Sequence, residues 1–229
     1  MHVSLDSALG RQRRLNSVGE SVLQIAPNAA AAYSLRSLTG GDPKVVRVRR
    51  SSDNGEQDFT ASGISSGALV AFVGSGNDGF VETWYDQSGN SKDAVQETAG
   101  SQPKIVSAGS LLNELLFEGS QVFDSITLSD SAQPNSIFTV SNTNVASQTR
   151  GIYGTNVSQA GYYRSSNKHA IFSTGTGSAT LEGAAYVADR DYLRFDLFNG
   201  ASSVLGVDGN TTSGTTGNAE LDRLDIGDS

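Results

Sequence analysis

The sequence of 229 residues contains no cysteine, only four prolines, one tryptophan and two histidines. Without cysteine the chain forms no disulfide and offers no thiolate as a ligand or nucleophile. His2 and His169 are too few and too far apart for a zinc site or a catalytic triad. No apolar run approaches the roughly 18 residues that cross a bilayer, so membrane insertion is not expected.

Glycine is abundant, with 26 residues, and short apolar segments alternate with polar turns at roughly ten-residue spacing. Period-two patterns predict strands at 33–38, 45–49, 80–85, 136–140 and 192–198, among others. One compact apolar cluster after a serine cap predicts a short helix at 65–73. The fold class predicted is all-β, an antiparallel β-sandwich of the jelly-roll kind with one short helix.

The net charge of −8 is unevenly distributed, because Arg and Lys crowd the first fifth of the chain. We expect residues 1–27 to form an extended basic N-terminal arm and residues 28–229 to form the sandwich. Arg11, Arg13 and Arg14 are candidates for docking the arm to an acidic partner, although a solvated basic segment fits the same charges. Nucleic-acid binding is disfavoured, because the acidic body repels phosphates.

Three segments in the first half carry a family resemblance. They are residues 32–36 (Ala-Tyr-Ser-Leu-Arg), residues 46–54, and residues 84–90 (Trp-Tyr-Asp-Gln-Ser-Gly-Asn). Together they resemble the opening of concanavalin-A-like, or laminin-G-like, β-sandwich domains. The similarity is to bacteriophage structural proteins and, more distantly, to the catalytic domains of B-type α-L-arabinofuranosidases.

Catalysis by a glycosidase needs two carboxylates about 5–10 Å apart across the sugar bond. The arabinofuranosidase resemblance implies such a pair well downstream of residue 90, but no downstream segment matches that pattern, and the expectation is a protein without enzymatic activity. Acids that could pair by chance are Glu82, Asp86, Glu114, Glu118, Glu182, Asp189, Asp191 and Asp196.

No cofactor is predicted, although two acidic loops contain the oxygen donors that Ca²⁺ prefers. One loop holds Asp53, Asn54, Glu56 and Asp58, and the other holds Asn77 and Asp78. Solvated loops explain the same residues, and neither loop has the spacing of a helix-loop-helix calcium site. Asp86 is expected to fix the turn that follows it, by accepting backbone N–H groups.

Aromatic side chains in the second half are the candidates for ligand binding, because sugar sites combine an aromatic face with polar partners. We select Tyr153, Tyr162, Tyr163 and Asp189. Adjacent Tyr162 and Tyr163 point to opposite faces of a strand, so one of them can be exposed. Tyrosine is also ordinary core material, and that interpretation stays open.

The resemblance favours a non-enzymatic structural protein of a phage virion, assembled in the host cytoplasm, in the capsid decoration or the tail. The arm would bind other virion proteins, and a lectin-like body would contact host-surface glycans. The alternative is a secreted glycoside hydrolase or carbohydrate-binding module of the arabinofuranosidase type. A third hypothesis is a homo-oligomer that packs against its own copies.

Overall fold

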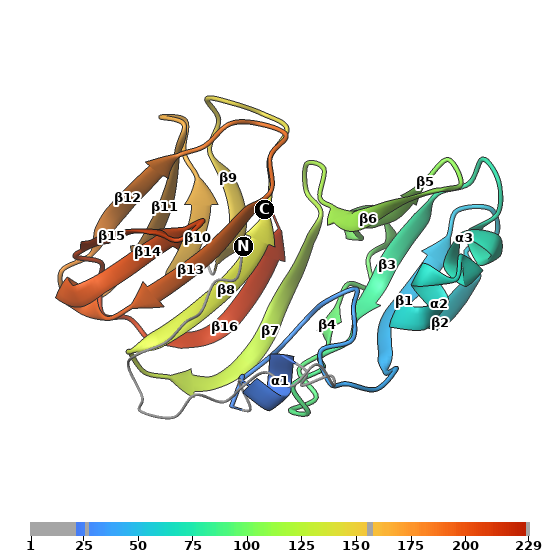
Figure 1. Cartoon of the computed structure of the whole chain (residues 1–229), viewed down its shortest axis with the longest axis horizontal. Helices are drawn as coiled ribbons and strands as arrows, with labels where there is room; N and C mark the ends of the chain where they lie inside the picture. The colour runs from blue at the N-terminus through green and yellow to red at the C-terminus, as the bar shows by residue number, and fades with distance from the viewer. Residues whose placement is uncertain (1–21, 26–27, 155–157, 228–229) are drawn as a thin grey trace, which may run out of the picture.

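The computed structural model describes residues 22–25, 28–154 and 158–227, and the predicted all-β antiparallel sandwich is confirmed. The strands form three antiparallel sheets in two lobes that lie side by side (Figure 1). We call residues 44–116 the first lobe and residues 122–227 the second lobe. The basic arm predicted at 1–27, with Arg11, Arg13 and Arg14, lies almost entirely outside the described residues.

The first lobe contains a single sheet, here called sheet A. Its strand order is β2 (Glu56–Thr60), β1 (Lys44–Arg50), β3 (Gly79–Trp84), β5 (Lys104–Ser107) and β6 (Ser110–Leu116), with β4 (Ala94–Val95) paired to β3.

The second lobe is a sandwich of two sheets. Sheet B has the order β12 (Ala179–Ala185), β11 (Lys168–Ser173), β10 (Gln159–Tyr163), β9 (Arg150–Gly154), β16 (Leu221–Gly227) and β7 (Val122–Ser131). Sheet C has the order β15 (Asn210–Gly214), β14 (Ser203–Val207), β13 (Tyr192–Phe198) and β8 (Asn135–Ser141).

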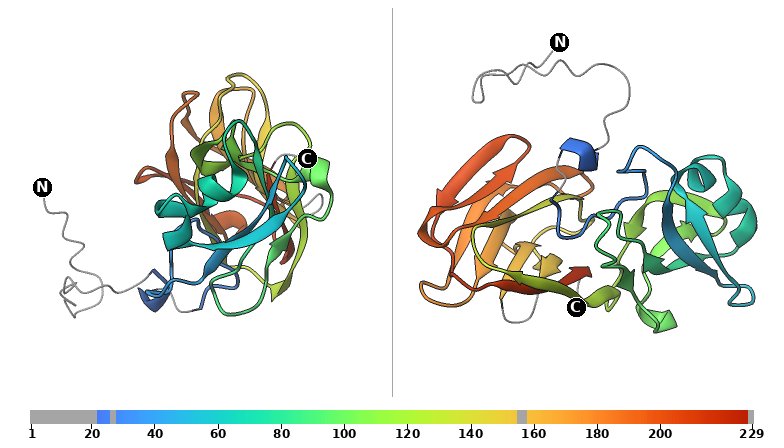
Figure 2. Two further views of the ribbon diagram at one scale, coloured as in Figure 1. Left: turned by 90° about the vertical axis from the view of Figure 1, so that its right-hand side faces the viewer. Right: turned by 90° about the horizontal axis from the view of Figure 1, so that it is seen from below.

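The helix predicted at 65–73 is two helices, α2 (Ala61–Ser65) and α3 (Ala68–Val73), separated by Gly67. Gly67 has a φ of +84°, a left-handed conformation that interrupts the helix and that glycine adopts without steric cost. Both helices lie on the side of sheet A that faces away from the second lobe (Figure 2). The remaining helical pieces are α1 (Val22–Ile25), η1 (Ala99–Ser101) and η2 (Gly200–Ser202), and none of the described helices is long and apolar enough to cross a membrane.

The molecule has two apolar cores. The first packs Val48, Phe59 and Leu69 between sheet A and its helices, and extends to Phe123 of β7. The second lies between sheets B and C. Strand β7 therefore belongs to the second lobe by hydrogen bonding and to the first core by packing, which fixes the lobes to one another.

The prediction of a strand at 33–38 is wrong, because side chains of the 84–90 turn replace a neighbouring strand. Asp86 Oδ1 accepts the N–H of Ala32 at 2.8 Å, and Gln87 Oε1 accepts the N–H of Leu38 at 2.8 Å. As predicted, Asp86 also fixes its own turn by accepting the N–H of Ser88 at 2.8 Å. The opening segment is thus held by side-chain hydrogen bonds without a strand ladder.

Candidate functional site

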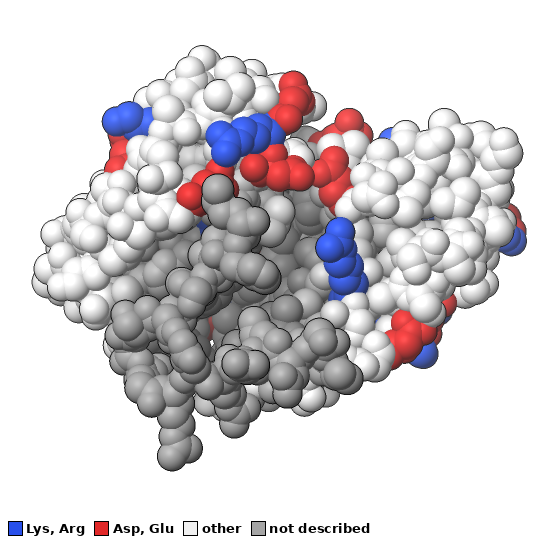
Figure 3. Space-filling view, viewed as in Figure 1, with Lys and Arg blue, Asp and Glu red and all other residues white. Residues whose placement is uncertain are grey.

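Acidic side chains gather along the upper rim of the hollow between the lobes (Figure 3). Hydrogen bonds and ion pairs divide the carboxylates considered for a functional site into two groups. One group lies on the open face of sheet A, opposite the helices. The other joins the first lobe to the ends of two strands of sheet C.

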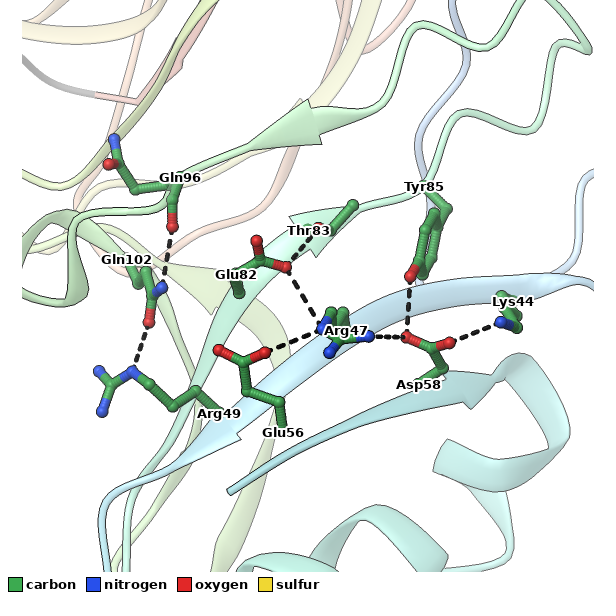
Figure 4. Close-up of polar contacts among 10 residues, drawn as sticks. All are labelled: Lys44, Arg47, Arg49, Glu56, Asp58, Glu82, Thr83, Tyr85, Gln96 and Gln102. Atoms are coloured by element: carbon green, nitrogen blue, oxygen red, sulfur yellow. Dashed lines mark hydrogen bonds and ion pairs between the residues drawn. The ribbon is translucent and has the colours of Figure 1, made fainter. Parts of the chain in front are cut away.

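Arg47 of β1 is the centre of the first group (Figure 4). Its guanidinium lies 3.0 Å from Glu56 Oε2, 3.4 Å from Asp58 Oδ1 and 3.8 Å from Glu82 Oε2. Lys44 Nζ lies 2.5 Å from the other oxygen of Asp58. We call these five residues the Arg47 network. Its carboxylates come from both strands that flank β1, so alternation along β2 and β3 places them on one face.

The electrostatics of the Arg47 network favour the ionised form of Asp58. The hydrogen bond from Lys44 lowers the pKa of Asp58, assisted by a hydrogen bond from Tyr85. Tyr85 Oη donates to Asp58 Oδ1 at 2.8 Å, and partial burial together with this acid raises the tyrosine pKa to about 12. A carboxylate held ionised by cations is a poor proton donor, so we interpret the network as a structural element of sheet A.

A chain of hydrogen bonds ties sheet A to the second lobe (Figure 4). Arg49 Nε donates to Gln102 Oε1 at 2.8 Å, and Gln102 Nε2 donates to the carbonyl of Gln96 at 2.8 Å. Gln96 Nε2 then donates to the carbonyl of Val122 at 2.7 Å. Gln96 and Gln102 are both buried. The two buried glutamine side chains thus form a continuous chain of hydrogen bonds from sheet A to β7. Such a buried network supports a rigid junction between the lobes.

The second group consists of Glu114, Asn142 and Asp191, which we call the junction trio. Asn142 Nδ2 lies 3.1 Å from Glu114 Oε2 and 2.7 Å from Asp191 Oδ1, so a single amide donates to both acids. Glu114 belongs to β6 of the first lobe, whereas the other two residues belong to the second lobe. Because both oxygens approach the same nitrogen, they lie within about 6 Å of each other, a spacing comparable to that of paired glycosidase carboxylates.

Strand pairing positions the two second-lobe members of the trio. In the antiparallel pair β8–β13, Ser141 lies opposite Tyr192. Asn142 follows Ser141 and Asp191 precedes Tyr192, so the next position of this register brings them together. The N–H of Asp189 donates to the carbonyl of Thr143 at 2.8 Å, which joins the two loops again.

Aromatic hydroxyls hold the backbone just before Asn142 and in the loop that leads to Asp191. Tyr163 Oη donates to the carbonyl of Ser141 at 2.9 Å, and Tyr192 Oη accepts the N–H of Val187 at 2.8 Å. Both tyrosines pack against His169, whose ring centroid lies 5.0 Å from Tyr163 and 4.6 Å from Tyr192. Burial of His169, followed by the charge of Arg194, lowers its pKa to about 4, so the ring is neutral near pH 7.

The sandwich also encloses an ion pair. Arg194 Nη2 lies 2.8 Å from Asp196 Oδ2, and Tyr153 Oη donates to the same oxygen at 2.6 Å. Arg194 and Asp196 are both completely buried. Burial raises the pKa of Asp196, and the arginine and the tyrosine hydroxyl oppose that rise. This pair lies beneath sheet C and has no route to a ligand in this arrangement.

The predicted ligand-binding residues do not form one group. Tyr153 and Tyr163 are buried in the second core, so no external ligand can stack on them. Tyr162 is half-buried and its hydroxyl lies 3.2 Å from Thr180 Oγ1. Asp189 is exposed, with a left-handed φ of +59°, in the loop that leads to Asp191.

Sequence reasoning considered Glu114 and Asp191 only as two acids among many, and it missed Asn142. No local motif marks this asparagine, because its role comes from strand pairing and from the approach of the first lobe. The two acidic loops that were considered for Ca²⁺ pair with basic side chains instead. Asp53 forms an ion pair with Arg50, and Asp78 forms one with Lys104. Within the described residues no group of three or more His, Cys, Asp or Glu is arranged to hold a metal.

The sequence matches no protein-family profile and no curated protein. Among solved structures, the fold is similar to a GH54 α-L-arabinofuranosidase mutant soaked with 4-nitrophenyl α-L-arabinofuranoside, with a TM-score of 0.64 and 11% identity over 90% of this chain and 57% of that one. The same kind of enzyme soaked with a cyclic sulfate inhibitor gives a TM-score of 0.61, again at 11% identity over 90% and 57% of the two chains.

An arabinofuranosidase complexed with arabinofuranosyl-α-1,2-xylobiose gives a TM-score of 0.54 at 11% identity, over 86% of this chain and 54% of that one. This chain therefore spans less than two thirds of the length of these enzymes. At such identity the likeness shows a shared fold and does not transfer a function.

These neighbours correct the functional expectation. The structural similarity is to glycoside hydrolases, so the prediction of a phage virion structural protein is wrong. The segments at 32–36 and 84–90 have a structural role in this chain, since Asp86 and Gln87 accept backbone N–H groups of the opening segment. A framework motif of this kind carries no information about assembly into a particle.

Proposed function

We propose that this chain is a carbohydrate-binding β-sandwich domain whose site is the junction trio. The observation that carries the proposal is the convergence of Glu114, Asn142 and Asp191 from two lobes onto one exposed point. Two carboxylates and an amide supply several acceptors and a donor within a short distance. Neighbouring hydroxyl groups of a sugar match such a set, because each hydroxyl both donates and accepts.

Binding explains the trio better than catalysis does. A general acid in a glycosidase is sheltered from water, because burial raises its pKa toward neutrality. Glu114 and Asp191 are both exposed. The fold shared with arabinofuranosidases favours neutral glycans with furanose residues as the first ligands to test, because one of those enzymes was soaked with an arabinofuranoside and another was complexed with an arabinofuranosyl oligosaccharide.

The binding experiment is calorimetric titration with arabinofuranosyl-α-1,2-xylobiose, extended to a panel of neutral oligosaccharides. Asn142→Ala should weaken binding by about tenfold or more, since it removes the donor that organises both acids. Asn144→Ala, an exposed asparagine in the next turn, is the matched control and should leave affinity unchanged. Absence of binding to the whole panel, or equal losses in both variants, would refute the proposal.

A second candidate, retaining glycoside hydrolysis, is favoured by one observation. The carboxylate oxygens of Glu114 and Asp191 lie within about 6 Å, and retaining enzymes place their carboxyl groups about 5–5.5 Å apart. In this mechanism one acid attacks the anomeric carbon while the other protonates the leaving oxygen.

Release of 4-nitrophenol from 4-nitrophenyl α-L-arabinofuranoside tests the second candidate. Turnover that is lost in both Glu114→Gln and Asp191→Asn, but kept in Glu118→Gln, would establish hydrolysis at the trio. Glu118 is a suitable control because it is an exposed glutamate just after β6. Binding without turnover would leave the carbohydrate-binding function alone.

A further inference from the structure

His169 is completely buried inside the second lobe. Within the described residues, neither of its two ring nitrogens has a hydrogen-bond partner. A buried polar group without a partner costs free energy, and such groups are rare in folded proteins. A phenyl ring would fill a similar volume without this cost. Because proteins keep such costs mainly at functional or strained sites, the histidine indicates a role other than packing.

Three tyrosine rings surround His169. Its ring centroid lies 4.6 Å from that of Tyr192, 5.0 Å from that of Tyr163 and 5.9 Å from that of Tyr186. These rings come from β13, from β10 and from the loop after β12, and all three tyrosines are buried. We call the histidine and the three tyrosines the aromatic cluster. Because a protein interior is closely packed, a displaced imidazole displaces the rings around it.

The aromatic cluster is joined directly to the two second-lobe members of the junction trio. Tyr163 Oη donates to the carbonyl of Ser141 at 2.9 Å, and the next residue in the chain is Asn142. Tyr192 directly follows Asp191. Both strand ends that present the trio are therefore held by rings that pack against the buried histidine.

The remaining hydroxyl contacts of the cluster hold neighbouring loops. Tyr192 Oη accepts the N–H of Val187 at 2.8 Å, and Tyr186 Oη donates to the carbonyl of Arg164 at 3.2 Å. The cluster thus connects the loop before β13 and the turn after β10 to the same buried centre. Loss of its packing would loosen this whole end of the second lobe.

The charged groups near His169 do not compensate a proton on its ring. Burial lowers the pKa of the histidine to about 4, and the charge of Arg194 in the same interior adds to this effect. Asp208 favours the proton and Arg190 opposes it, and these two form an ion pair with each other at 2.6 Å. Asp196 is already paired with Arg194. A protonated His169 is therefore an uncompensated buried charge, which is stabilised only when the ring reaches water.

We propose that His169 is an acid-sensitive switch, in which a proton on its ring releases the strand ends that carry Asn142 and Asp191 and so disassembles the junction trio. The released state is a local opening in which the ring is hydrated. The closed state is fully favoured above pH 6.5, and the open state gains as the pH falls toward 4, because it binds the proton more tightly. Release of a bound glycan rests on the proposed function, whereas release of the strand ends depends on the fold alone.

Nuclear magnetic resonance tests the switch in the full chain without ligand. His2→Gln leaves His169 as the only histidine, so the ring signals report its proton directly. Hydrogen exchange is followed at the N–H of Asp189, which is bonded to the carbonyl of Thr143 beside the trio. Its protection relative to an unfolded chain should fall by about tenfold for each pH unit between 6.5 and 4. The N–H of Gln96, bonded within the first lobe, is the control and should keep its protection.

His169→Phe separates the histidine from the acids of the trio, because it keeps a ring in the aromatic cluster but binds no proton. Protection of the Asp189 N–H should no longer depend on pH in this variant. An equal pH dependence in the wild type and in His169→Phe overturns the proposal, since other groups would then be responsible. If His169→Phe does not fold, the His2→Gln protein still decides. Protection that stays constant while the ring of His169 takes up its proton overturns the proposal as well.

Calorimetric titration with arabinofuranosyl-α-1,2-xylobiose connects the switch to the proposed site. The affinity of the wild type should be about tenfold or more weaker near pH 4 than above pH 6.5, and His169→Phe should lose less of its affinity. Equal losses in the two proteins would overturn the control of binding by His169. Absence of binding at every pH would refute the proposed function, and the exchange measurements would still decide whether the strand ends are released.

Discussion

The Arg47 network of the first lobe and the Arg194–Asp196 pair of the second lobe use the same chemistry in opposite environments. In the first, two cations share three carboxylates on an open face, and the side chain of Arg47 is 39% exposed. In the second, one cation meets one acid without exposure to water. An exposed network tolerates the loss of any member, because water and neighbours replace it. A buried pair has no replacement, so each partner is essential to the other.

The largest effect is expected from Asp196→Ala. This change leaves Arg194 buried without an anion and should lower the free energy of unfolding by about 3–5 kcal/mol. Urea denaturation measures the loss. The double variant Arg194→Met with Asp196→Leu is the control, and it should recover most of the stability because it removes both charges. A loss below about 1 kcal/mol for the single variant would show that the pair is not isolated from water.

Acid should destabilise the second lobe through His169. Its pKa is about 4 in the folded protein and 6.5 in an unfolded chain, so the unfolded state binds more protons between these values. The stability contributed by the neutral ring is therefore fully present above pH 6.5 and is lost as the pH falls toward 4. The loss amounts to at most about 3 kcal/mol.

Thermal unfolding at a series of pH values measures this loss. The difference between the wild type and His169→Gln isolates the histidine, because the carboxylates contribute equally to both proteins. Parallel pH profiles for the two proteins would contradict the prediction.

A smaller effect is expected from Tyr153→Phe. The hydroxyl donates to Asp196 Oδ2 at 2.6 Å inside the sandwich, and a hydrogen bond to a charged acceptor contributes about 2 kcal/mol. Chemical denaturation of Tyr162→Phe provides the control, since the hydroxyl of Tyr162 is on the outer side and contacts Thr180. The control should change stability by a few tenths of a kcal/mol. Equal losses in the two variants would rule out a special contribution of the buried bond.

The smallest effect is expected at the centre of the exposed network. Arg47→Met should change the free energy of unfolding by less than about 1 kcal/mol, and the change should shrink further in high salt. Denaturation at low and high ionic strength checks both parts of this expectation. A loss of unfolding free energy as large as that of Asp196→Ala would contradict the prediction that exposed ion pairs contribute less to stability than the buried pair.

Local patterns in the sequence were sufficient for much of the fold. Strict alternation predicted β13 at its observed bounds, because one side of that strand is buried and the other faces outward. The same rule failed for residues 33–38, where the backbone groups are satisfied by the side chains of Asp86 and Gln87. Alternation reports only which side is buried, and it does not report which group supplies the hydrogen bond.

The candidate site could not be predicted from local sequence patterns. Glu114, Asn142 and Asp191 are separated by tens of residues, and nothing in their local sequences distinguishes them from other polar residues at strand ends. Tyr153 and Tyr163 were selected as candidates for ligand binding, with a place in the core as the alternative, and their rings fill the second core. Which face of a strand turns inward is a property of the partner sheet, so a single strand cannot reveal it.

The sequence by itself determined the absence of thiol chemistry, the all-β class, the lack of charge along β8 and the turn at Asp86. These depend on composition and on residues a few positions apart. Only the tertiary structure decided that one amide would bind two acids from different lobes, and that Arg194 and Asp196 would be sealed beneath sheet C. The physical reason is that such contacts depend on sheet packing and strand register, which join residues far apart in the chain.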